Sequence, residues 1–254
     1  MQLYLKAIRE KDELILPIHH NEILQGVVYS HLGEQLAERI HTTGVKDPES
    51  DRGLKLFTFS RIISVRKPII DEHEKKIKFP LPITWVVASP LYEFVVSFYN
   101  NLIKKHTIHI QYEEQVLHLY HIWVKPPPSY KKTIFIETLS PITVYRTEER
   151  DGKTFTHYYS PQDPEFNKLI LLNLLRKYRT LTGKNITLDD AYIKPVRVAK
   201  RENILYFKDT VIKGWSGIFE LSLPKELFTL AFSCGLGAKN SQGFGCIGIW
   251  RGNL

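Results

Sequence analysis

The hydrophobic positions of the first half of this chain follow two periods, and together they predict a mixed fold. Residues 1–8 alternate between apolar and polar side chains, which is typical of a strand. A helical period begins at Asn21, a residue suited to cap a helix, is interrupted at Gly33 and resumes over 34–40. Further strands are expected over 54–65, 77–88 and 107–124, and a further helix over 89–105. This order of elements is the βαββαβ order of a ferredoxin-like or RNA-recognition-type domain.

The second half repeats the order after a proline-rich linker at residues 125–129. Strands are expected over 131–145, 188–198 and 244–250, helices over 164–181 and 223–233, and hairpins over 203–223. The predicted fold class is therefore α+β, with tandem ferredoxin-like (RRM-like) βαββαβ domains over residues 1–125 and 126–254 and a C-terminal glycine-rich loop.

That loop covers residues 234–248, where five of the 14 glycines fall within fifteen positions. Such density indicates positive φ angles or the close approach of another group. Two interpretations stand beside each other: an elaborate turn ahead of the last strand, or a nest of amides and side chains that binds an anion. The loop lacks the G-K-[ST] sequence of a phosphate-binding loop of nucleotide-hydrolysing enzymes.

The charge of the chain favours a polyanionic partner. The formal net charge is +8, and it is uneven, since residues 1–125 carry +1 and residues 126–254 carry +7. No run of eighteen apolar residues is present, and the two cysteines form no Cys-x-x-Cys pair, so neither a membrane span nor a zinc site is expected. We expect a cytoplasmic protein with reduced thiols.

Three segments carry a resemblance to a known family. The glycine pattern of residues 234–248 resembles the C-terminal signature of the repeat-associated RNA-binding (RAMP) proteins of CRISPR systems, and within them the CRISPR-associated protein 6 family. Residues 24–29 and 53–60 resemble that family's first helix and second strand. The three segments span the chain. The resemblance implies an endoribonuclease that cuts precursor CRISPR RNA within its repeats, without a metal or other cofactor.

RNA cleavage of this kind makes definite chemical demands. The 2′-hydroxyl beside the scissile phosphate must lose a proton, the leaving 5′-oxygen must gain one, and the phosphorane needs cationic donors. The resemblance places these tasks on His41, Tyr29 and Lys55, and implies a 2′,3′-cyclic phosphate and a 5′-hydroxyl as products. His41 also has a simpler interpretation as a cation at a helix end. In one unbroken helix Tyr29 and His41 would be separated by about 18 Å of rise, so we expect the chain to bend at Gly33.

A basic surface is expected in the second half, where cations are interleaved with Tyr192, Tyr206 and Phe207. The alternative is a solvated edge strand whose charges prevent aggregation. The predicted RNA-binding residues are Lys194, Arg197, Lys200, Arg201, Lys239, Gly235, Gly237, Gly243 and Gly245.

The expected partner is CRISPR repeat RNA, with a CRISPR effector complex as a further candidate and no membrane. The protein is expected to be a monomer or a homodimer. The rival functions are a non-catalytic subunit that holds the repeat in such a complex, and a generic RNA-binding tandem domain.

Overall fold

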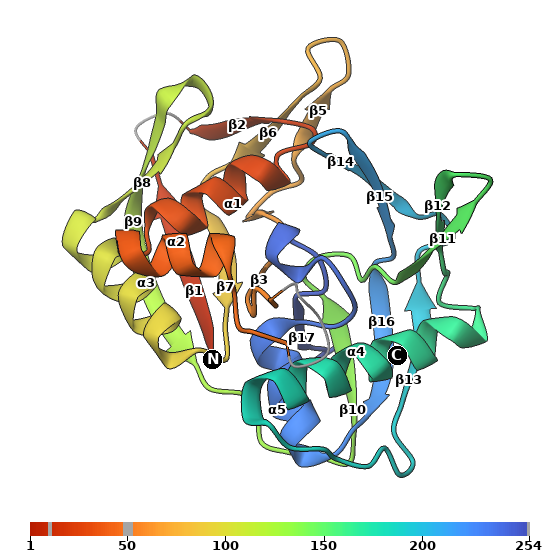
Figure 1. Ribbon diagram of the computed structural model, residues 1–254. Coiled ribbons are helices and arrows are strands. Elements are labelled where there is room, and N and C mark those ends of the chain that lie inside the picture. The colour runs from red at the N-terminus through yellow and green to blue at the C-terminus, as the bar shows by residue number, and fades with distance from the viewer. Residues whose placement is uncertain (10–11, 48–52, 253–254) are drawn as a thin grey trace.

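The computed structural model describes residues 1–9, 12–47 and 53–252 of the chain. Two main sheets, each covered by helices, lie side by side, and two hairpins project from the second (Figure 1). The helices are α1 (Asn21–Ser30), α2 (Glu34–Thr42), α3 (Tyr92–Lys105), α4 (Pro164–Thr182) and α5 (Lys225–Cys234). The strands are β1 (Gln2–Ile8), β2 (Glu13–Pro17), β3 (Thr58–Phe59), β4 (Ile63–Ser64), β5 (Ile69–Asp71), β6 (Lys76–Pro80), β7 (Ile83–Ala88), β8 (Thr107–Ile110), β9 (Gln115–Lys125), β10 (Thr133–Thr138), β11 (Tyr145–Arg150), β12 (Lys153–Tyr158), β13 (Tyr192–Val198), β14 (Asn203–Phe207), β15 (Thr210–Gly214), β16 (Gly217–Ser222) and β17 (Ile247–Ile249).

The first sheet has the strand order β3-β7-β1-β9-β8, with β4 also paired to β7, and its neighbours are antiparallel. The alternation in β1 places Leu3 and Leu5 on the face that packs against the helices, where both are buried. Phe94 and Phe98 of α3 stack in the same core with ring centroids 6.0 Å apart. This core fixes α1 and α3 against the sheet.

The sequence predicted three long continuous strands that the structure divides, so these three predictions are wrong. Residues 77–88 divide into β6 and β7, which belong to different sheets, at a turn containing Pro82. Residues 107–124 form the β8–β9 hairpin, because Glu113 and Glu114 take positive φ angles. Of residues 54–65, only β3 and β4 pair in the sheet.

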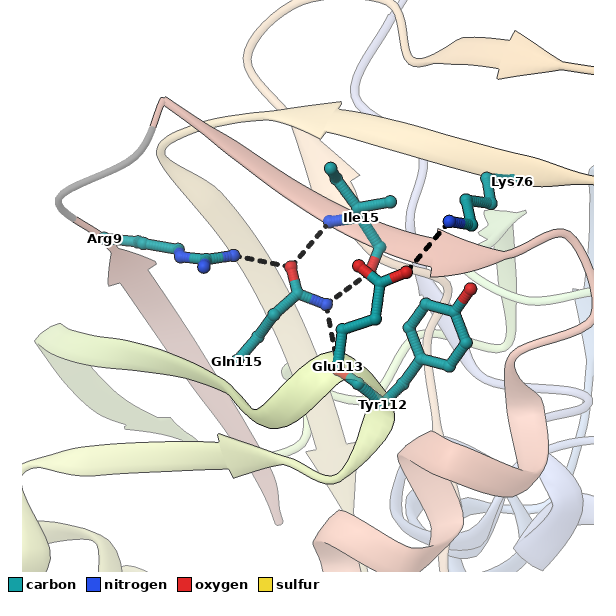
Figure 2. A network of polar contacts seen from close by, with 6 residues as sticks. All are labelled: Arg9, Ile15, Lys76, Tyr112, Glu113 and Gln115. Atoms are coloured by element: carbon teal, nitrogen blue, oxygen red, sulfur yellow. Dashed lines mark hydrogen bonds and ion pairs between the residues drawn. The ribbon is translucent and has the colours of Figure 1, made fainter. Parts of the chain in front are cut away.

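A small sheet, β2-β6-β5, lies against the first sheet and is tied to it by Gln115 (Figure 2). The buried Gln115 amide accepts hydrogen bonds from Ile15 N (3.1 Å) and Arg9 Nη1 (2.5 Å). It donates to Ile15 O (2.6 Å) and Tyr112 O (3.1 Å), so its hydrogen-bonding capacity is filled. Gln115 is the first residue of β9, and its amide is hydrogen-bonded to β2. These bonds therefore fix the position of the small sheet on the first main sheet.

The second main sheet has the order β13-β16-β10-β17, and α4 and α5 supply its core. Phe166 of α4 stacks on Phe219 of β16 with centroids 6.0 Å apart. The β14–β15 hairpin was expected from the sequence, whereas the β11–β12 hairpin was not predicted. Within the part of the chain that the structure describes, no helix is both long enough and apolar enough to cross a membrane.

Candidate active site and nucleic-acid interface

The break between α1 and α2 shapes the first candidate site. α1 ends at Ser30, and Gly33 caps the start of α2 with the extended angles φ −62° and ψ 144°. The Gly33 amide donates to Ser97 Oγ (2.9 Å), which ties the turn to α3. His31 is buried in the turn, with Nδ1 2.9 Å from Val27 O, and burial lowers its pKa. The predicted bend at Gly33 is confirmed.

The bend brings Tyr29 and His41 together. Their ring centroids lie 5.3 Å apart at an interplanar angle of 80°, and Tyr29 also meets Phe57 edge to face at 5.7 Å. His41 is exposed on α2, whereas Tyr29 is half-buried. The pair is held from the Tyr29 side by the core and is open to solvent from the His41 side.

The Tyr29 hydroxyl is buried, and it has no hydrogen-bond partner among the described residues. Burial raises the pKa of Tyr29 to about 12, because the phenolate is poorly solvated there. At neutral pH this group is therefore a neutral phenol whose proton is available to an acceptor that comes to it.

An open pocket of about 510 Å³ lies over the pair. Residues of both α1 and α2 line this pocket, among them the carboxylates Glu34 and Glu38. An imidazole beside a neutral phenol in such a pocket can move a proton and donate a hydrogen bond to an oxyanion. The lining residues are Tyr29, Ser30, Leu32, Glu34, Ala37, Glu38, His41 and Thr42.

Lys55 does not line the Tyr29–His41 pocket, and its catalytic role stays a prediction. It follows the Val45–Leu54 bridge, outside any strand. Burial lowers the pKa of its ammonium, and the positive charge of Lys208 lowers it further. Lys208 belongs to the turn of the β14–β15 hairpin, so the charge of this turn acts on the Lys55 ammonium.

The glycine-rich loop packs between the two main sheets. Gly235, Gly237, Gly243 and Gly245 all have positive φ and all are buried. A Cβ at Gly243 would lie 2.4 Å from the Phe59 ring. Close packing therefore accounts for these glycines, and their contact with RNA stays a prediction.

The loop joins the two halves of the chain through hydrogen bonds. Asn21 Nδ2 donates to Gln242 O (2.7 Å), Gln25 Nε2 to Ser241 O (2.6 Å) and Thr58 Oγ1 to Phe244 O (2.9 Å). These hydrogen bonds tie the loop to α1 and β3 of the first half. Its two flanking cysteines, Cys234 and Cys246, are free and buried.

A buried lysine, which was not among the residues predicted from the sequence, holds the loop through hydrogen bonds. Lys177 Nζ donates to Gly235 O (3.0 Å), Gly237 O (2.9 Å) and Asn240 Oδ1 (2.6 Å). Burial lowers its pKa to about 8. The spacing along α4 could have indicated that Lys177 is buried. Positions 170, 174 and 177 lie on one face of the helix, and Ile170 and Leu174 on that face are fully buried.

The predicted basic surface lies on β13, at the edge of the second sheet. Lys194 Nζ lies 4.1 Å from the Tyr192 ring centroid, and the Arg197 guanidinium 5.4 Å from the Trp250 ring. Lys200 and Arg201 are exposed in the turn that follows. Phe207, expected to stack on RNA, is instead buried in a small core with Phe244.

Lys239 lies apart from that edge, and its ammonium is 5.2 Å from the Tyr145 ring. Burial lowers its pKa. Cations stacked on aromatic rings are suited to phosphate contact with bases stacking nearby.

Comparison with known proteins agrees with this architecture. Residues 124–249 match the family model "CRISPR associated protein Cas6, C-terminal". A curated relative, the CRISPR-associated endoribonuclease Cas6 of Pyrococcus furiosus, is 25% identical over 240 residues, covering 92% of this chain and 83% of the relative.

Two solved structures share the fold. A Cas6-related protein from Pyrococcus furiosus superposes with a TM-score of 0.83 at 22% identity, covering 100% of this chain and 99% of its own. A RAMP protein described as binding different RNA substrates superposes with a TM-score of 0.81 at 20% identity, covering 99% and 100%. The resemblance stated from the sequence is confirmed.

Proposed function

We propose that this chain, whose residues 124–249 match the Cas6 C-terminal family model, is an endoribonuclease that binds precursor CRISPR RNA and cleaves it within the repeat. The observation that carries the proposal is the edge-to-face contact of the His41 and Tyr29 rings at the bend between α1 and α2, with a Tyr29 hydroxyl that has no hydrogen-bond partner among the described residues. The relative from Pyrococcus furiosus is named an endoribonuclease, which supports the class of reaction.

The proposed reaction needs no metal. A base removes the 2′-hydroxyl proton, the 2′-oxygen attacks the adjacent phosphorus, and the bond to the 5′-oxygen breaks. The products are a 2′,3′-cyclic phosphate and a 5′-hydroxyl that has taken up a proton. His41 carries one of the two proton transfers, because imidazole exchanges protons near neutral pH.

Tyr29 has a different task from His41. With its pKa raised to about 12, it keeps its proton and donates a hydrogen bond to a phosphate oxygen or to the nucleophile. Lys55 supplies positive charge that stabilises the phosphorane at the cut.

We also propose that the chain is built from two ferredoxin-like domains, residues 1–125 and 126–254. The strand orders β9-β1-β7-β3 and β13-β16-β10-β17 support this, because each places the first and third strands of a βαββαβ unit in the centre. The helices of each unit supply its core.

RNA binding is proposed to use the cations of the second domain. Lys194 and Arg197 on the edge strand, Lys200 and Arg201 in the next turn, and Lys239 beside the loop form the candidate set. The four loop glycines take part through the shape of the backbone, which keeps Lys239 in its left-handed conformation at the surface.

The test uses end-labelled repeat RNA from the host, incubated in EDTA with wild-type protein, with His41→Ala, and with a substrate carrying a 2′-deoxy nucleotide at the cut. We expect one cut per repeat that survives EDTA and is lost with either change. Tight binding without cleavage by the wild type would contradict the proposal and favour a subunit that only holds the repeat.

A further inference from the structure

A second cavity, of about 450 Å³, lies where the small sheet meets the second half of the chain. Three segments form its walls: the turn from β2 into α1, the residues from before β4 to β6, and the start of β14. Figure 1 shows β14 approaching β5 and β6 at this place. The residues that matter below are His19, His20, Arg61, Phe79, Asn203 and Ile204.

One cation is directed across the cavity. Arg61 Nη2 donates to Asn203 Oδ1 at 2.6 Å, and the Arg61 backbone amide donates to Leu139 O at 2.9 Å. These bonds fix the side chain at both ends but use only one of the five guanidinium N–H groups. Among the described residues that line the cavity, none is Asp or Glu, so Arg61 has no carboxylate partner there.

His20 supplies an acceptor. Its Nδ1 lies 3.0 Å from Pro17 O, and a carbonyl oxygen can only accept, so Nδ1 carries the proton and Nε2 presents a lone pair. Burial lowers the pKa of His20 to about 4, which keeps the ring neutral at physiological pH. Its ring meets Phe79 edge to face at 5.5 Å.

The remaining lining is mainly apolar, with His19 and Asn21 as further polar residues. Ile204 in this lining is 49% exposed, and Tyr206, next to the lining, places its ring 4.7 Å from that of His19. The cavity is thus a slot with mainly apolar walls, in which Arg61 supplies a donor and His20 an acceptor. A planar heterocycle with acceptors on one edge and donors on another matches this set.

The walls are held in place before any ligand arrives. The Gln115 amide fixes Ile15 of β2 (Figure 2), two residues before the strand ends beside the cavity. Asn203 Nδ2 donates to Ser216 Oγ at 3.2 Å, which fixes the other wall. A rigid slot is suited to selecting one base.

We propose that this cavity holds one unpaired nucleobase of the bound RNA, with the O6 and N7 edge of a guanine facing Arg61. The proposal rests on the proposed function, because it takes RNA as the ligand. Arginine donates hydrogen bonds to O6 and N7 of guanine. Guanine also carries N–H groups, from which His20 Nε2 can accept a hydrogen bond.

The position of the cavity agrees with a continuous RNA path. It lies at the start of α1, and Tyr29 follows Asn21 by about 12 Å of helix rise. The glycine-rich loop lies between, bonded to Asn21 and Gln25. The base in the cavity would therefore belong to a nucleotide a few positions from the scissile phosphate.

The experiment measures binding of repeat RNA that carries a 2′-deoxy nucleotide at the cut, so that cleavage does not interfere. Each guanosine is replaced singly by 7-deazaguanosine, which lacks N7. Arg61→Gln is compared with Arg66→Gln, which removes the same charge from an exposed position five residues away. We expect Arg61→Gln to weaken binding about tenfold or more and Arg66→Gln to change it less than about threefold. One 7-deaza position should weaken wild-type binding and have no further effect on Arg61→Gln.

Several results would overturn the proposal. One is equal behaviour of the two arginine variants; another is a uniform loss for all RNAs with a lower salt dependence, which would make Arg61 a phosphate contact. A third is a dimer that Ile204→Asp dissociates without changing RNA affinity, which would make this face a protein interface. Urea unfolding of Arg61→Gln, with Arg61→Lys as a second variant, separates lost recognition from lost folding.

Cleavage of unmodified repeat by the same wild-type preparation tests the proposed function separately. A protein that binds with dependence on one guanine but does not cut would contradict the enzyme and support the cavity. A protein that cuts the repeat but whose binding depends on no single guanine would support the enzyme and contradict the proposed guanine site.

Discussion

Tyr29 and His41 are twelve residues apart in the sequence, yet their rings meet edge to face with centroids 5.3 Å apart. The contact exists because α1 stops at Ser30 and α2 starts after Gly33 in a new direction. One ring lies over the core and the other in solvent, so the pair combines a fixed phenol with an imidazole accessible to RNA.

His41→Ala is expected to lower the single-turnover cleavage rate of repeat RNA by about 10²–10⁴-fold, since it removes a proton-transfer group. Tyr29→Phe keeps the ring contact and removes only the hydroxyl, so a smaller loss, about tenfold or more, is expected. RNA affinity, measured by filter binding, should change less than about threefold. His106→Ala, at an exposed position after α3, is the control. A loss of affinity as large as the loss of rate would show a binding role instead.

Gly243→Ala is expected to destabilise the protein by about 2–5 kcal/mol. The φ of +83° costs an alanine about 1–2 kcal/mol, and the new Cβ would overlap the Phe59 ring 2.4 Å away. Gly152→Ala is the matched control, because Gly152 has a φ of +70° and nothing within 4 Å of an added Cβ. Urea unfolding of both variants isolates the cost of the overlap. Equal losses would mean that Phe59 yields easily.

Lys177→Met is expected to cost about 2–5 kcal/mol, because three buried acceptors lose their donor. Lys168→Met, on an exposed part of the same helix, serves as the control. Hydrogen exchange of residues 235–245 should rise in Lys177→Met alone. If the exchange of this loop does not change, the ammonium does not hold it.

The Lys177 variant also has a pH signature. The pKa of Lys177 is lowered to about 8 in the folded protein, so the unfolded chain holds the extra proton between about pH 8 and pH 10.5. This group therefore makes wild-type stability rise with pH across that window. The rise should be smaller in Lys177→Met.

His20 should make the protein sensitive to acid. Its pKa is lowered to about 4, so between pH 6.5 and pH 4 the unfolded chain binds a proton that the folded chain does not. Stability should therefore fall by about 1 kcal/mol between pH 7 and pH 5.5 from this group. His20→Asn keeps a donor for Pro17 O and should remove that part of the fall in urea unfolding experiments. His73→Asn, whose histidine side chain is 94% exposed, should leave the fall unchanged.

The periodic patterns predicted most helices and the central strands because their burial repeats locally. β1 and α4 show this, since every second residue of one and every third or fourth of the other is buried. The errors came where an element changes partner within an apolar run. The division of residues 77–88 between two sheets depends on which strand each half meets, and alternation is the same for both.

At the candidate site, the resemblance selected His41 and Tyr29, and helix geometry required the bend that places them together. Two features were not predicted. The effect of the Lys208 charge on Lys55 depends on packing between segments distant in the sequence. Lys177 was passed over because a lysine in a helix is usually solvated, and only the loop carbonyls that fold over it make burial tolerable.

The hydrogen bonds that join the two halves have a consequence for synthesis on the ribosome. Thr58 and Gln2 bond residues that follow them by 186 and 245 positions. A nascent chain whose first sheet has emerged must therefore wait for the glycine-rich segment before these donors are satisfied. Contacts this distant slow folding, because a long loop closes before they form. A chain that ended after β16 would lack the glycine-rich loop, so Asn21, Gln25 and Thr58 of the first half would lose these hydrogen-bond acceptors.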